Sequence, residues 1–349
     1  MKKQTKLLAV LSTAVFMAAA TPNLYTFAQS TGWVEDGGHW YYYDNDGYSV
    51  TDSWKKKGND WFYLDAEGRT AYDQQIDEFY VDAEGRMITN QWISVANEDE
   101  WDTPDSPEYF WYYYGKDGKL VTNKWLNLND SWYYLNEEGR MHTGRFEQDG
   151  AVYYFDDATG IMKTGWAEFE EDSDDPDAST YWSYFNSNGQ MVMNQVRKKI
   201  DNKLYTFVNG KMQTGLKVIT LENEEIANFY FGNDGVMKTG KQTIYNEELD
   251  QNETWFFYTD GSRKGQGFHG IRDNAIYSYG LRQDADADLR YAAVKSGDTE
   301  YLVNTSGAIQ KAASSTKSTE KPDLGTGYKD IKDANGTVWT VDTAGRIQR

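Results

Sequence analysis

Tryptophan is the residue type of this chain that is best suited to hold a ligand. The 349 residues include 13 Trp, 27 Tyr and 15 Phe, but no Cys and only three His. The histidines, His39, His142 and His269, are far apart in the sequence, so we expect no metal site or catalytic triad from them. Most of the tryptophans form pairs, seven residues apart in three cases and further apart in two. The pairs are Trp33 with Trp40, Trp54 with Trp61, Trp92 with Trp111, Trp125 with Trp132, and Trp166 with Trp182.

Acidic side chains are numerous, and they limit the functions that the chain can have. The net charge of −20 and the pI near 4.6 argue against a nucleic-acid partner, whose phosphates need a basic surface. The runs 172–177 (DSDDPD) and 284–288 (DADAD) could attract calcium, but they lack the glycine and terminal glutamate of a calcium loop. Carboxylate pairs are plentiful, but no pocket-forming domain is evident that would raise a pKa. We therefore expect no cofactor and no enzyme.

The tryptophan pairs are part of a repeat of about twenty residues, which predicts an array of small structural units. Each copy has an aromatic segment, a turn that ends in glycine, and a short polar segment, as in 131–144 (SWYYLNEEGRMHTG). Trp132-Tyr133-Tyr134-Leu135 alternates as a strand with apolar groups on both faces. The glycine suits the left-handed position of a hairpin turn. An isolated hairpin is marginal in water, so each must pack on its neighbours. We predict an all-β solenoid of stacked β-hairpin repeats.

About a dozen such repeats can be counted. Their aromatic strands begin near Trp40, Trp61, Phe79, Trp111, Trp132, Val152, Trp182, Leu204, Asn228, Trp255, Tyr301 and Val338, with a weaker one near Ile276. Two repeats carry acidic insertions that contain proline, at 97–108 and 170–180, and we expect these to be solvent-exposed loops.

The N-terminal segment predicts export. Lys2, Lys3 and Lys6 precede an apolar run, and cleavage is expected after Ala28, so 1–28 reads as a secretory signal peptide. No later segment is apolar enough to span a membrane. Residues 312–327 (AASSTKSTEKPDLGTG) have the composition of a flexible linker. The predicted division is a signal peptide at 1–28, Trp-rich repeats at 29–195, degenerate repeats at 196–311, a linker at 312–327 and a terminal repeat at 328–349.

Gly32-Trp33, Trp40-Tyr41-Tyr42 and 162–166 (MKTGW) resemble the choline-binding, or cell-wall-binding, repeat of secreted Gram-positive surface proteins. The resemblance is strong from Gly32 to Gln195 and weaker beyond. It implies that hairpins stack into a left-handed superhelix, with each choline between consecutive hairpins, held by two tryptophans of one repeat and an aromatic ring of the next. It further implies a non-catalytic protein that is attached non-covalently to the cell wall through choline on teichoic acid or a similar polymer.

Physical chemistry agrees with this implied ligand. A quaternary ammonium donates no hydrogen bond, so aromatic ring faces must recognise it, each contributing about 0.5–2 kcal/mol. Several weak sites facing one polymer would add up to a high apparent affinity. Carried over to this sequence, the cages are Trp33, Trp40 and Tyr63; Trp54, Trp61 and Tyr80; Trp92, Trp111 and Tyr134; Trp125, Trp132 and Tyr154; and Trp166, Trp182 and Tyr205. A neighbouring ring could replace the third member, such as Trp61, Phe79, Trp132 or Tyr153.

The sequence leaves other interpretations open. The tryptophans could serve only to pack hairpins together. One repeat has Phe146 and Val152 in place of the pair, the repeat at Ile76 has no tryptophan, and the Gly-Trp element is lost from Val196 onward. An alternative function is a glycan-binding module of the α-glucan type, because Tyr and Trp stack on sugar rings. A less favoured alternative is the anchor of a wall-lytic enzyme.

Overall fold

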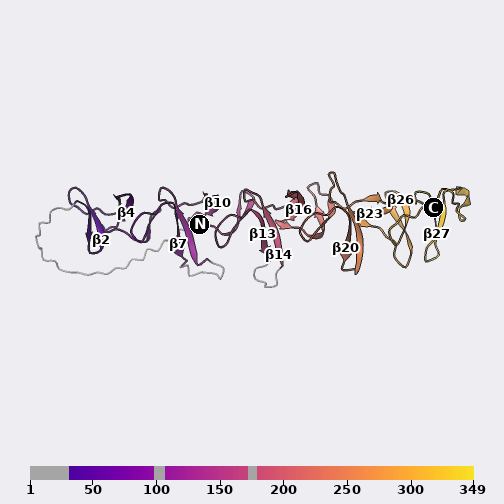
Figure 1. Cartoon of the computed structure of the whole chain (residues 1–349), viewed down its shortest axis with the longest axis horizontal. Coiled ribbons are helices and arrows are strands. Elements are labelled where there is room, and N and C mark those ends of the chain that lie inside the picture. Colours follow the sequence, from indigo (N-terminus) through magenta and orange to yellow (C-terminus); the bar gives the residue numbers. More distant parts are fainter. Residues whose placement is uncertain (1–30, 98–106, 172–178) are drawn as a thin grey trace, which may run out of the picture. The chain divides into compact units, whose positions relative to one another are not determined.

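The computed structural model describes residues 31–97, 107–171 and 179–349, which consist almost entirely of β-strands and turns (Figure 1). The only helical element within these ranges is a short 3-10 helix, η1 (Pro322–Leu324). No helix in the described parts of the chain is long and apolar enough to cross a membrane. The predicted all-β class is therefore confirmed. The expected signal peptide, at 1–28, and the middle of both insertions lie outside the described residues.

The chain divides into two compact units. Unit 1 contains the residues up to Leu126 together with Tyr134–Met141, and unit 2 contains Asn127–Tyr133 and His142–Arg349. Unit 1 is a series of antiparallel hairpins: β1 (Gly32–Asp36) with β2 (His39–Tyr43), β3 (Ser53–Lys57) with β4 (Asp60–Leu64), β5 (Gln74–Ile76) with β6 (Phe79–Val81), and β7 (Gln91–Ala96) with β8 (Tyr109–Tyr114). A further two-stranded sheet pairs β9 (Lys124–Leu128) with β10 (Ser131–Leu135), and its residues are divided between the units.

Unit 2 continues the same pattern, with some larger sheets. Its two-stranded sheets are β11 (Gly144–Gln148) with β12 (Ala151–Phe155), β13 (Gly165–Glu170) with β14 (Thr180–Phe185), β18 (Gly215–Thr220) with β19 (Ile226–Phe231), and β25 (Tyr291–Ser296) with β26 (Thr299–Asn304). Its three-stranded sheets are β15 (Gln195–Ile200), β16 (Lys203–Val208) and β17 (Lys211–Met212), and β27 (Lys329–Lys332), β28 (Val338–Val341) and β29 (Ile347–Gln348). One five-stranded sheet has the order β20 (Gly240–Asn246), β21 (Gln251–Phe257), β24 (Leu281–Arg282), β23 (Ala275–Ser278), β22 (Gly270–Arg272).

The hairpins differ from the prediction in which segments they join. We expected each aromatic strand to pair with the short segment after the glycine turn. In the structure the aromatic strand pairs instead with the segment before it, so that Trp33 lies opposite Tyr42 in β1 and β2. The turn at Asp44–Gly47 leads only to a single bridge between Tyr43 and Ser49. In many other repeats the segment after the turn likewise adds a single bridge to its own hairpin, and in two repeats it forms the predicted short second strand, because β17 pairs with β16 and β29 pairs with β28.

These bonds to the preceding hairpin recur in both units. In unit 1 the backbone N–H of Thr70 donates to the carbonyl of Trp40 at 2.9 Å, and that of Met87 to Trp61 at 2.7 Å. In unit 2 the N–H of Met191 donates to the carbonyl of Val152 at 2.7 Å, and that of Met237 to Leu204 at 2.8 Å. Each donor follows the glycine turn of one repeat, and each acceptor lies in the aromatic strand of an earlier hairpin. The hairpins of each unit are thus joined by backbone hydrogen bonds as well as by packing.

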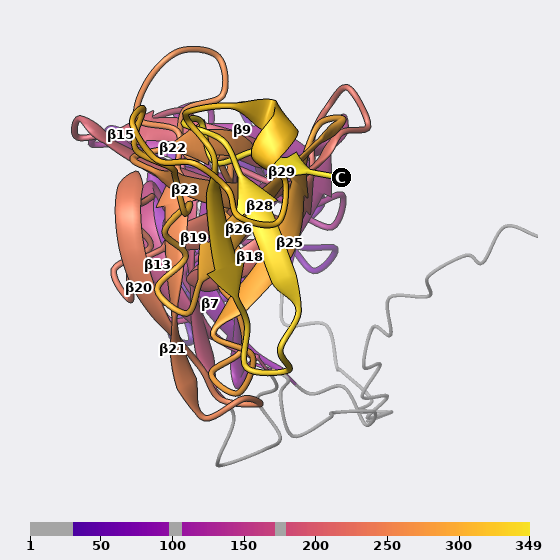
Figure 2. The same ribbon diagram turned by 90° about the vertical axis from the view of Figure 1, so that its right-hand side faces the viewer.

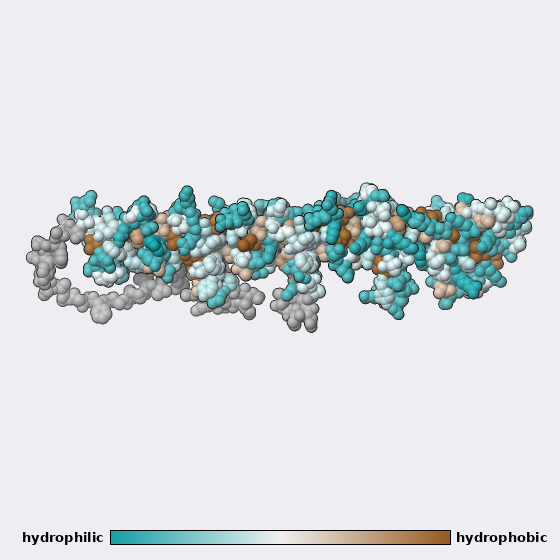
Figure 3. All heavy atoms as spheres, viewed as in Figure 1, coloured by the Kyte–Doolittle hydropathy of each residue, from teal (hydrophilic) through white to brown (hydrophobic). Residues whose placement is uncertain are grey.

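One equivalent position recurs in the core along the chain. An apolar residue at or near the end of most aromatic strands is almost completely buried, whereas the visible surface in Figure 3 is mainly hydrophilic with small separate hydrophobic patches. The buried residues at this position include Leu64, Val81, Leu135, Phe155, Phe185, Phe207, Phe231, Phe257, Val303 and Val341. Because each repeat contributes few such residues, the core is a thin line of side chains that only neighbouring hairpins can cover.

The glycine of each turn has two physical roles. Gly189 adopts φ 81°, a left-handed conformation that most side chains disfavour. A Cβ atom on Gly189 would also overlap the Sδ atom of Met162, a buried residue of the preceding repeat. Gly235 and Gly265 meet Met212 and Met237 in the same way. The glycine turn of one repeat therefore packs directly against the methionine that follows the turn before it.

The close packing of Gly189 gives a stability prediction. We expect Gly189→Ala to lower the free energy of unfolding by about 2–4 kcal/mol, because left-handed strain and overlap with Met162 act together. The matched control is Gly150→Ala, which has a similar φ of 75° but nothing within 4 Å of the added Cβ. It should cost only the backbone strain, about 1–2 kcal/mol. Urea unfolding followed by tryptophan fluorescence measures both, and equal losses would show that packing on Met162 contributes nothing.

The segment 312–327 has more structure than the flexible linker that we predicted. Ala312 and Ser318 are buried, and Lys317 forms a β-bridge with Thr326. The Asp330 carboxylate accepts hydrogen bonds from the Ser318 hydroxyl at 2.5 Å and from the backbone N–H groups of Thr319 and Glu320 at 2.6 and 3.0 Å. Ser, Thr and Lys are frequent in flexible linkers, but here their polar groups are fixed by an acceptor in the terminal repeat.

The terminal repeat packs on β26. Figure 2 shows β26 and β28 side by side, and a bridge joins Tyr301 to Arg346. Leu302 of β26, Ile331 of β27 and Val341 of β28 form one buried cluster. The last repeat of unit 2 is therefore part of the packed array.

The hydrogen bonds of Asp330 predict a pH-dependent local stability. Burial alone raises the pKa of Asp330, but hydrogen bonds from Ser318, Glu320, Thr340 and Thr319 together hold it below its ordinary value. A depressed carboxylate pKa stabilises the fold at pH values above about 3.9, the ordinary value for unfolded Asp, and this stabilisation is lost as the pH falls through the folded pKa.

We expect Asp330→Asn to expose the peptide bond after Lys317 to trypsin at neutral pH, because the Ser318 and Thr319 bonds are weakened. Mass spectrometry of timed digests measures this cleavage. Asp323→Asn, an exposed change in the same segment, should leave the cleavage rate unchanged. If both variants are cut as slowly as the wild type, the carboxylate does not hold this segment.

Candidate ligand-binding site

The two tryptophans of each pair lie on one face of a hairpin. In β1 and β2, Trp33 is opposite Tyr42 and Trp40 is opposite Glu35. Directly paired residues share a face, and so do residues two apart in one strand, which places both indoles on the same side. Three other pairs have the same register. In each of them the first tryptophan lies opposite a tyrosine (Trp54 and Tyr63, Trp92 and Tyr113, Trp166 and Tyr184). The second tryptophan lies opposite a polar residue (Trp61 and Lys56, Trp111 and Ser94, Trp182 and Glu168).

The first tryptophan of a pair is fixed by packing. The ring centroids of Trp33 and Tyr42 lie 5.5 Å apart in an edge-to-face arrangement, and those of Trp166 and Tyr184 lie 5.1 Å apart. The Trp33 indole N–H also donates to the carbonyl of Lys56 at 3.0 Å, which ties this ring to the next hairpin. These rings are half-buried and their orientation is defined by their neighbours.

The second tryptophan presents part of its ring to solvent. The exposed fractions of Trp61, Trp111, Trp132 and Trp182 are 42%, 42%, 42% and 40%. Such a uniform exposure at equivalent positions is expected where a ring face is kept available for a ligand, since a ring that only packs hairpins together would be more covered. Trp40 occupies the same position in its hairpin but is more covered than these four.

In the first two cages the third ring is not the predicted tyrosine, and in the second cage it is Phe79, one of the expected replacements. The ring centroid of Trp33 lies 5.6 Å from that of Phe62, and the centroid of Trp54 lies 5.3 Å from that of Phe79. The predicted Tyr63 packs on Trp54 of its own hairpin at 5.3 Å. The predicted Tyr80 donates a hydrogen bond to Asp73 and packs on Tyr114. A shift of one residue along a strand moves a side chain to the opposite face, so Tyr63 and Tyr80 point away from the preceding tryptophan pair.

The same shift applies to the predicted Tyr134 and Tyr154. Tyr134 lies 5.5 Å from Trp125 of its own hairpin, and its hydroxyl donates to Asn123 at 2.7 Å. Tyr154 lies 4.7 Å from Phe169 and donates to Asp157 at 2.7 Å. Burial first, and then the hydrogen bond to Asp157, raise the pKa of Tyr154, which fits a structural hydroxyl. The position equivalent to Phe62 is occupied by Tyr133 and Tyr153 in these repeats.

The fifth predicted cage is brought together as predicted. The ring centroid of Trp166 lies 6.5 Å from Trp182 and 4.9 Å from Tyr205, and both contacts are edge-to-face. Tyr205 is buried, whereas Trp182 lines an open cavity of about 560 Å³ together with Glu171 and Lys217. In this cage one face of an indole remains accessible, and the other two rings define its surroundings.

The first cage already holds a cation of the protein itself. A cavity of about 320 Å³ is lined by Trp33, Trp40, Lys57, Phe62 and other residues. The Lys57 Nζ atom lies 2.8 Å from the ring centroid of Trp40 and 5.6 Å from that of Trp33. Burial lowers the pKa of Lys57 and the carboxylate of Glu35 partly offsets this. The rings of Trp33, Trp40 and Phe62 thus form a site whose geometry suits a positive charge.

Sequence reasoning missed Lys57 and Phe62, whereas Phe79 was among the neighbouring rings expected as possible replacements. Phe62 could have been found from the two-residue period, because the residue directly after the Trp61 position must face the previous hairpin. Lys57 is on the same face of β3 and β4 as Phe62, but a lysine beside a hairpin turn usually extends into solvent. No pattern in the sequence alone shows whether the Lys57 side chain extends into solvent or lies over the ring of Trp40.

Repeats without paired tryptophans keep the register and lose the rings. In β11 the residue opposite Tyr154 is Arg145, so Arg145 takes the position of the first tryptophan, and the Phe146 that we expected there faces the other side. Val152 takes the second position, as expected. Further along, Leu216 lies opposite Tyr230 and Lys241 opposite Phe256. These hairpins have the fold of the repeat without an aromatic cage.

The two late tryptophans have different surroundings. Trp255 is buried, and its ring is nearly parallel to that of Phe257 at 6.0 Å. The Trp339 indole donates a hydrogen bond to Asp333 at 3.1 Å. Neither residue shows the half-exposed ring of Trp61 or Trp182.

Metal-binding residues do not gather in the described part of the chain. Within those ranges no group of three or more His, Cys, Asp or Glu side chains could hold a metal ion. Asp284, in one of the two acidic runs, forms a bidentate ion pair with Arg282, with Nε–Oδ1 and Nη2–Oδ2 distances of 2.6 and 2.7 Å. The other run, 172–177, lies outside the described residues.

Comparisons with known proteins bear on the same repeats. A choline-binding repeat family model matches residues 124–166, and a putative cell wall binding repeat model matches residues 31–49 and 52–69. These ranges contain three of the tryptophan pairs. A comparison with curated protein sequences found no match.

Several solved structures of proteins from Streptococcus pneumoniae are similar to the chain. The modular autolysin LytC from Streptococcus pneumoniae is 19% identical, with 80% of this chain and 52% of that chain covered and a TM-score of 0.48. Choline binding protein F from the same organism is 19% identical, with 92% and 100% covered and a TM-score of 0.41. The choline-binding domain of CbpL, also from S. pneumoniae, is 23% identical, with 61% and 100% covered and a TM-score of 0.42. The chain spans about half the length of the LytC chain that it matches.

Lys57 gives a direct test of the first cage. We expect Lys57→Ala to add one binding site for tetramethylammonium, because the ring face of Trp40 loses its internal cation. Isothermal titration calorimetry measures the number of sites. Lys116→Ala removes the same charge at an exposed position and should leave that number unchanged. An equal number of sites in Lys57→Ala and the wild type would contradict this account of the cavity.

Proposed function

Because residues 31–49, 52–69 and 124–166 belong to the choline-binding, or cell-wall-binding, repeat family, we propose that the protein binds choline groups of a cell-wall polymer through its tryptophan pairs. The polymer is teichoic acid or a similar chain that carries phosphocholine. In this proposal the protein is exported, acts without catalysis and is held at the cell surface by non-covalent contacts alone.

One observation carries the proposal most directly. The Lys57 ammonium is 2.8 Å from the centroid of Trp40 and lies in a cavity lined also by Trp33 and Phe62. Ring faces around a positive charge are also what attracts a trimethylammonium group, since such a group has no N–H to donate. At the equivalent positions Trp61 and Trp182, the residue is 42% and 40% exposed.

The revised cages follow from the register. They contain the two tryptophans of one hairpin and the residue of the next hairpin that faces them. Trp54, Trp61 and Phe79 form one such set in unit 1, and Trp166, Trp182 and Tyr205 form another in unit 2. Three rings at about 0.5–2 kcal/mol each correspond to a dissociation constant near the millimolar range for one site.

A repeated ligand would make such weak sites effective. When one polymer chain presents many choline groups, the second and later contacts form at a high local concentration, and the overall affinity rises well above that of one site. The net charge of −20 further attracts a cationic ligand, and Glu168 lies directly opposite Trp182 in its hairpin. Attachment by several cages therefore needs no covalent anchor.

A resin that carries tertiary amines tests this function. We expect the protein to be retained on it and to be released by free choline but not by soluble α-glucan. Release by glucan alone would favour the glycan-binding alternative, and clearing of a cell-wall suspension by the purified protein would contradict a non-catalytic role.

A pair of variants tests the cages. Trp182→Ala should weaken choline binding at one site by about 2-fold to 30-fold, which corresponds to the free energy that one ring face contributes. It should also lower the choline concentration needed for release from the resin. Trp339→Ala changes a tryptophan that bonds to Asp333 instead and should leave retention unchanged. Equal effects of the two changes would mean that the paired tryptophans only pack hairpins together.

A further inference from the structure

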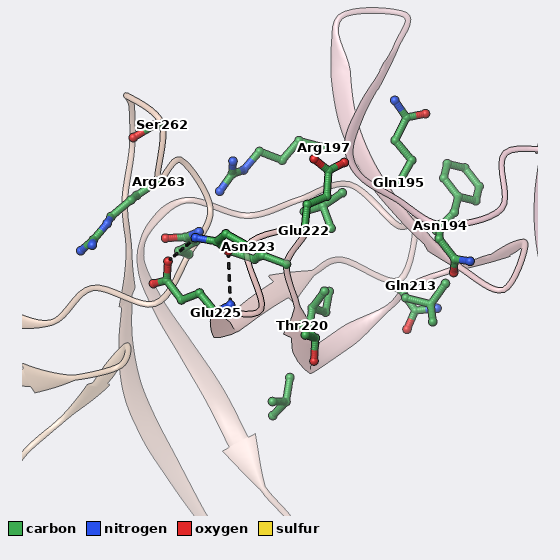
Figure 4. A pocket seen from close by; sticks show the side chains of 17 residues that line it. Asn194, Gln195, Arg197, Gln213, Thr220, Glu222, Asn223, Glu225, Ser262 and Arg263 are labelled. Carbon is green, nitrogen blue, oxygen red and sulfur yellow. Dashed lines mark hydrogen bonds between the residues drawn. The ribbon is translucent and has the colours of Figure 1, made fainter.

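A large cavity in unit 2 is separate from the tryptophan pairs. It has a volume of about 980 Å³, within the range of small-molecule sites, and it is lined by residues of β15, β16, β18 and the loops beside them. Amide side chains are frequent in its lining, including Asn194, Gln195 and Gln213. Two arginines, Arg197 and Arg263, line it as well. Figure 4 shows Arg197 between Ser262 and Arg263 on one side and Asn194 and Gln195 on the other.

Arg197 has an unusual backbone conformation. The register of β15 and β16 shifts between Gln195 and Lys198, and Arg197 adopts φ 61° at this bulge. A left-handed conformation is unfavourable for a side chain of this kind, and glycine or asparagine would adopt it more readily. The Arg197 N–H bonds to the hydroxyl of the buried Thr206 at 3.4 Å in place of a regular partner. Strain of this kind is retained mainly where the side chain it presents has a use.

The guanidinium of Arg197 is only partly satisfied. Its Nε atom donates to the carbonyl of Lys264 at 2.8 Å, and the group lies 5.7 Å from the ring centroid of Phe229. Its Nη2 atom is buried and has no hydrogen-bond partner among the described residues. Burial lowers the pKa of Arg197, although a guanidinium remains charged. A buried cationic donor without an acceptor is costly, and an anionic ligand would supply the missing acceptor.

The carboxylates of the cavity do not supply this acceptor. Glu222 and Glu225 line the cavity but are exposed, and Glu225 accepts a hydrogen bond from Asn223 instead. Arg263 is also exposed at the opposite side. The cavity thus combines an inner cation that lacks one acceptor, a second cation, Arg263, whose side chain is hydrogen-bonded to Tyr258, and amide groups that can bond to hydroxyl or amide substituents.

We propose that this cavity binds an anionic sugar, with the carboxylate or phosphate group on Arg197 and Arg263 and the hydroxyl groups on the surrounding amides. The net charge of −20 repels anions in general, so binding here depends on these local contacts. The site is independent of the choline cages, because none of the paired tryptophans lines it.

Calorimetric titration of the full chain with glucuronate, glucose 6-phosphate and neutral glucose tests the proposal. We expect at least one anionic sugar to bind at least 10-fold more tightly than glucose. Comparing the affinities for glucuronate and glucose 6-phosphate shows whether a carboxylate or a phosphate is preferred. Arg197→Gln and Arg263→Gln should each weaken that binding, Arg197→Gln by 10-fold or more. Arg145→Gln, an exposed arginine outside the cavity, should not. No preference over glucose, or equal losses in all three variants, would overturn the proposal.

Arg197→Gly separates binding from folding. Glycine accepts φ 61° and removes the unsatisfied charge, so we expect an unchanged or higher urea midpoint together with loss of anionic-sugar binding. A lower midpoint with binding retained would show that Arg197 has a structural role only. If this variant does not fold, the soluble Arg197→Gln and Arg263→Gln proteins still decide the outcome.

Discussion

The backbone hydrogen bond from one repeat to an earlier hairpin is the interaction on which the other features depend. The N–H of Met87, for example, reaches the carbonyl of Trp61, and the N–H of Met191 reaches that of Val152. These bonds fix the distance between successive hairpins within a unit, and only at that distance can a buried residue such as Phe185 be covered. The glycine turns are required for the same reason, because a side chain at Gly189 would separate the layers.

The aromatic cages are a consequence of this stacking. Two hairpins held at a fixed distance place one face of the first against the opposite face of the second, so alternate residues of both strands meet. Trp33 therefore meets Phe62, and Trp54 meets Phe79. The second tryptophan of a pair lies nearer the hairpin turn than the first, and at Trp61 its ring is partly exposed. A ligand site arises at the edge of each stacked pair without any residue outside the repeat.

The sequence was sufficient to predict the aromatic strands, but not the strands that pair with them or the residues that meet across the stack. All the predicted aromatic strands, from the one at Trp40 to the one at Val338, are present, because alternation and the glycine turns are local properties. Tyr63 and Phe62 are both aromatic, and only the register between hairpins shows which one faces Trp33. Segment 312–327 was predicted as a linker because its acceptor, Asp330, is outside the segment. Lys57 and Arg197 depend on tertiary contacts that composition does not encode.

Because Lys57 lies over Trp40, the number of sites that are open to an external ligand can be smaller than the number of tryptophan pairs. A lysine tethered a few residues away acts as an internal competitor with a fixed effective concentration, of millimolar order for a short tether. The concentration of an external cation must exceed this effective concentration before the cation can displace Lys57 from the first pair. Lys57 does not compete for the other pairs. Repeats of nearly identical sequence can thus differ in the ligand concentration at which they fill, and a single charged residue at a hairpin tip is enough to set that threshold.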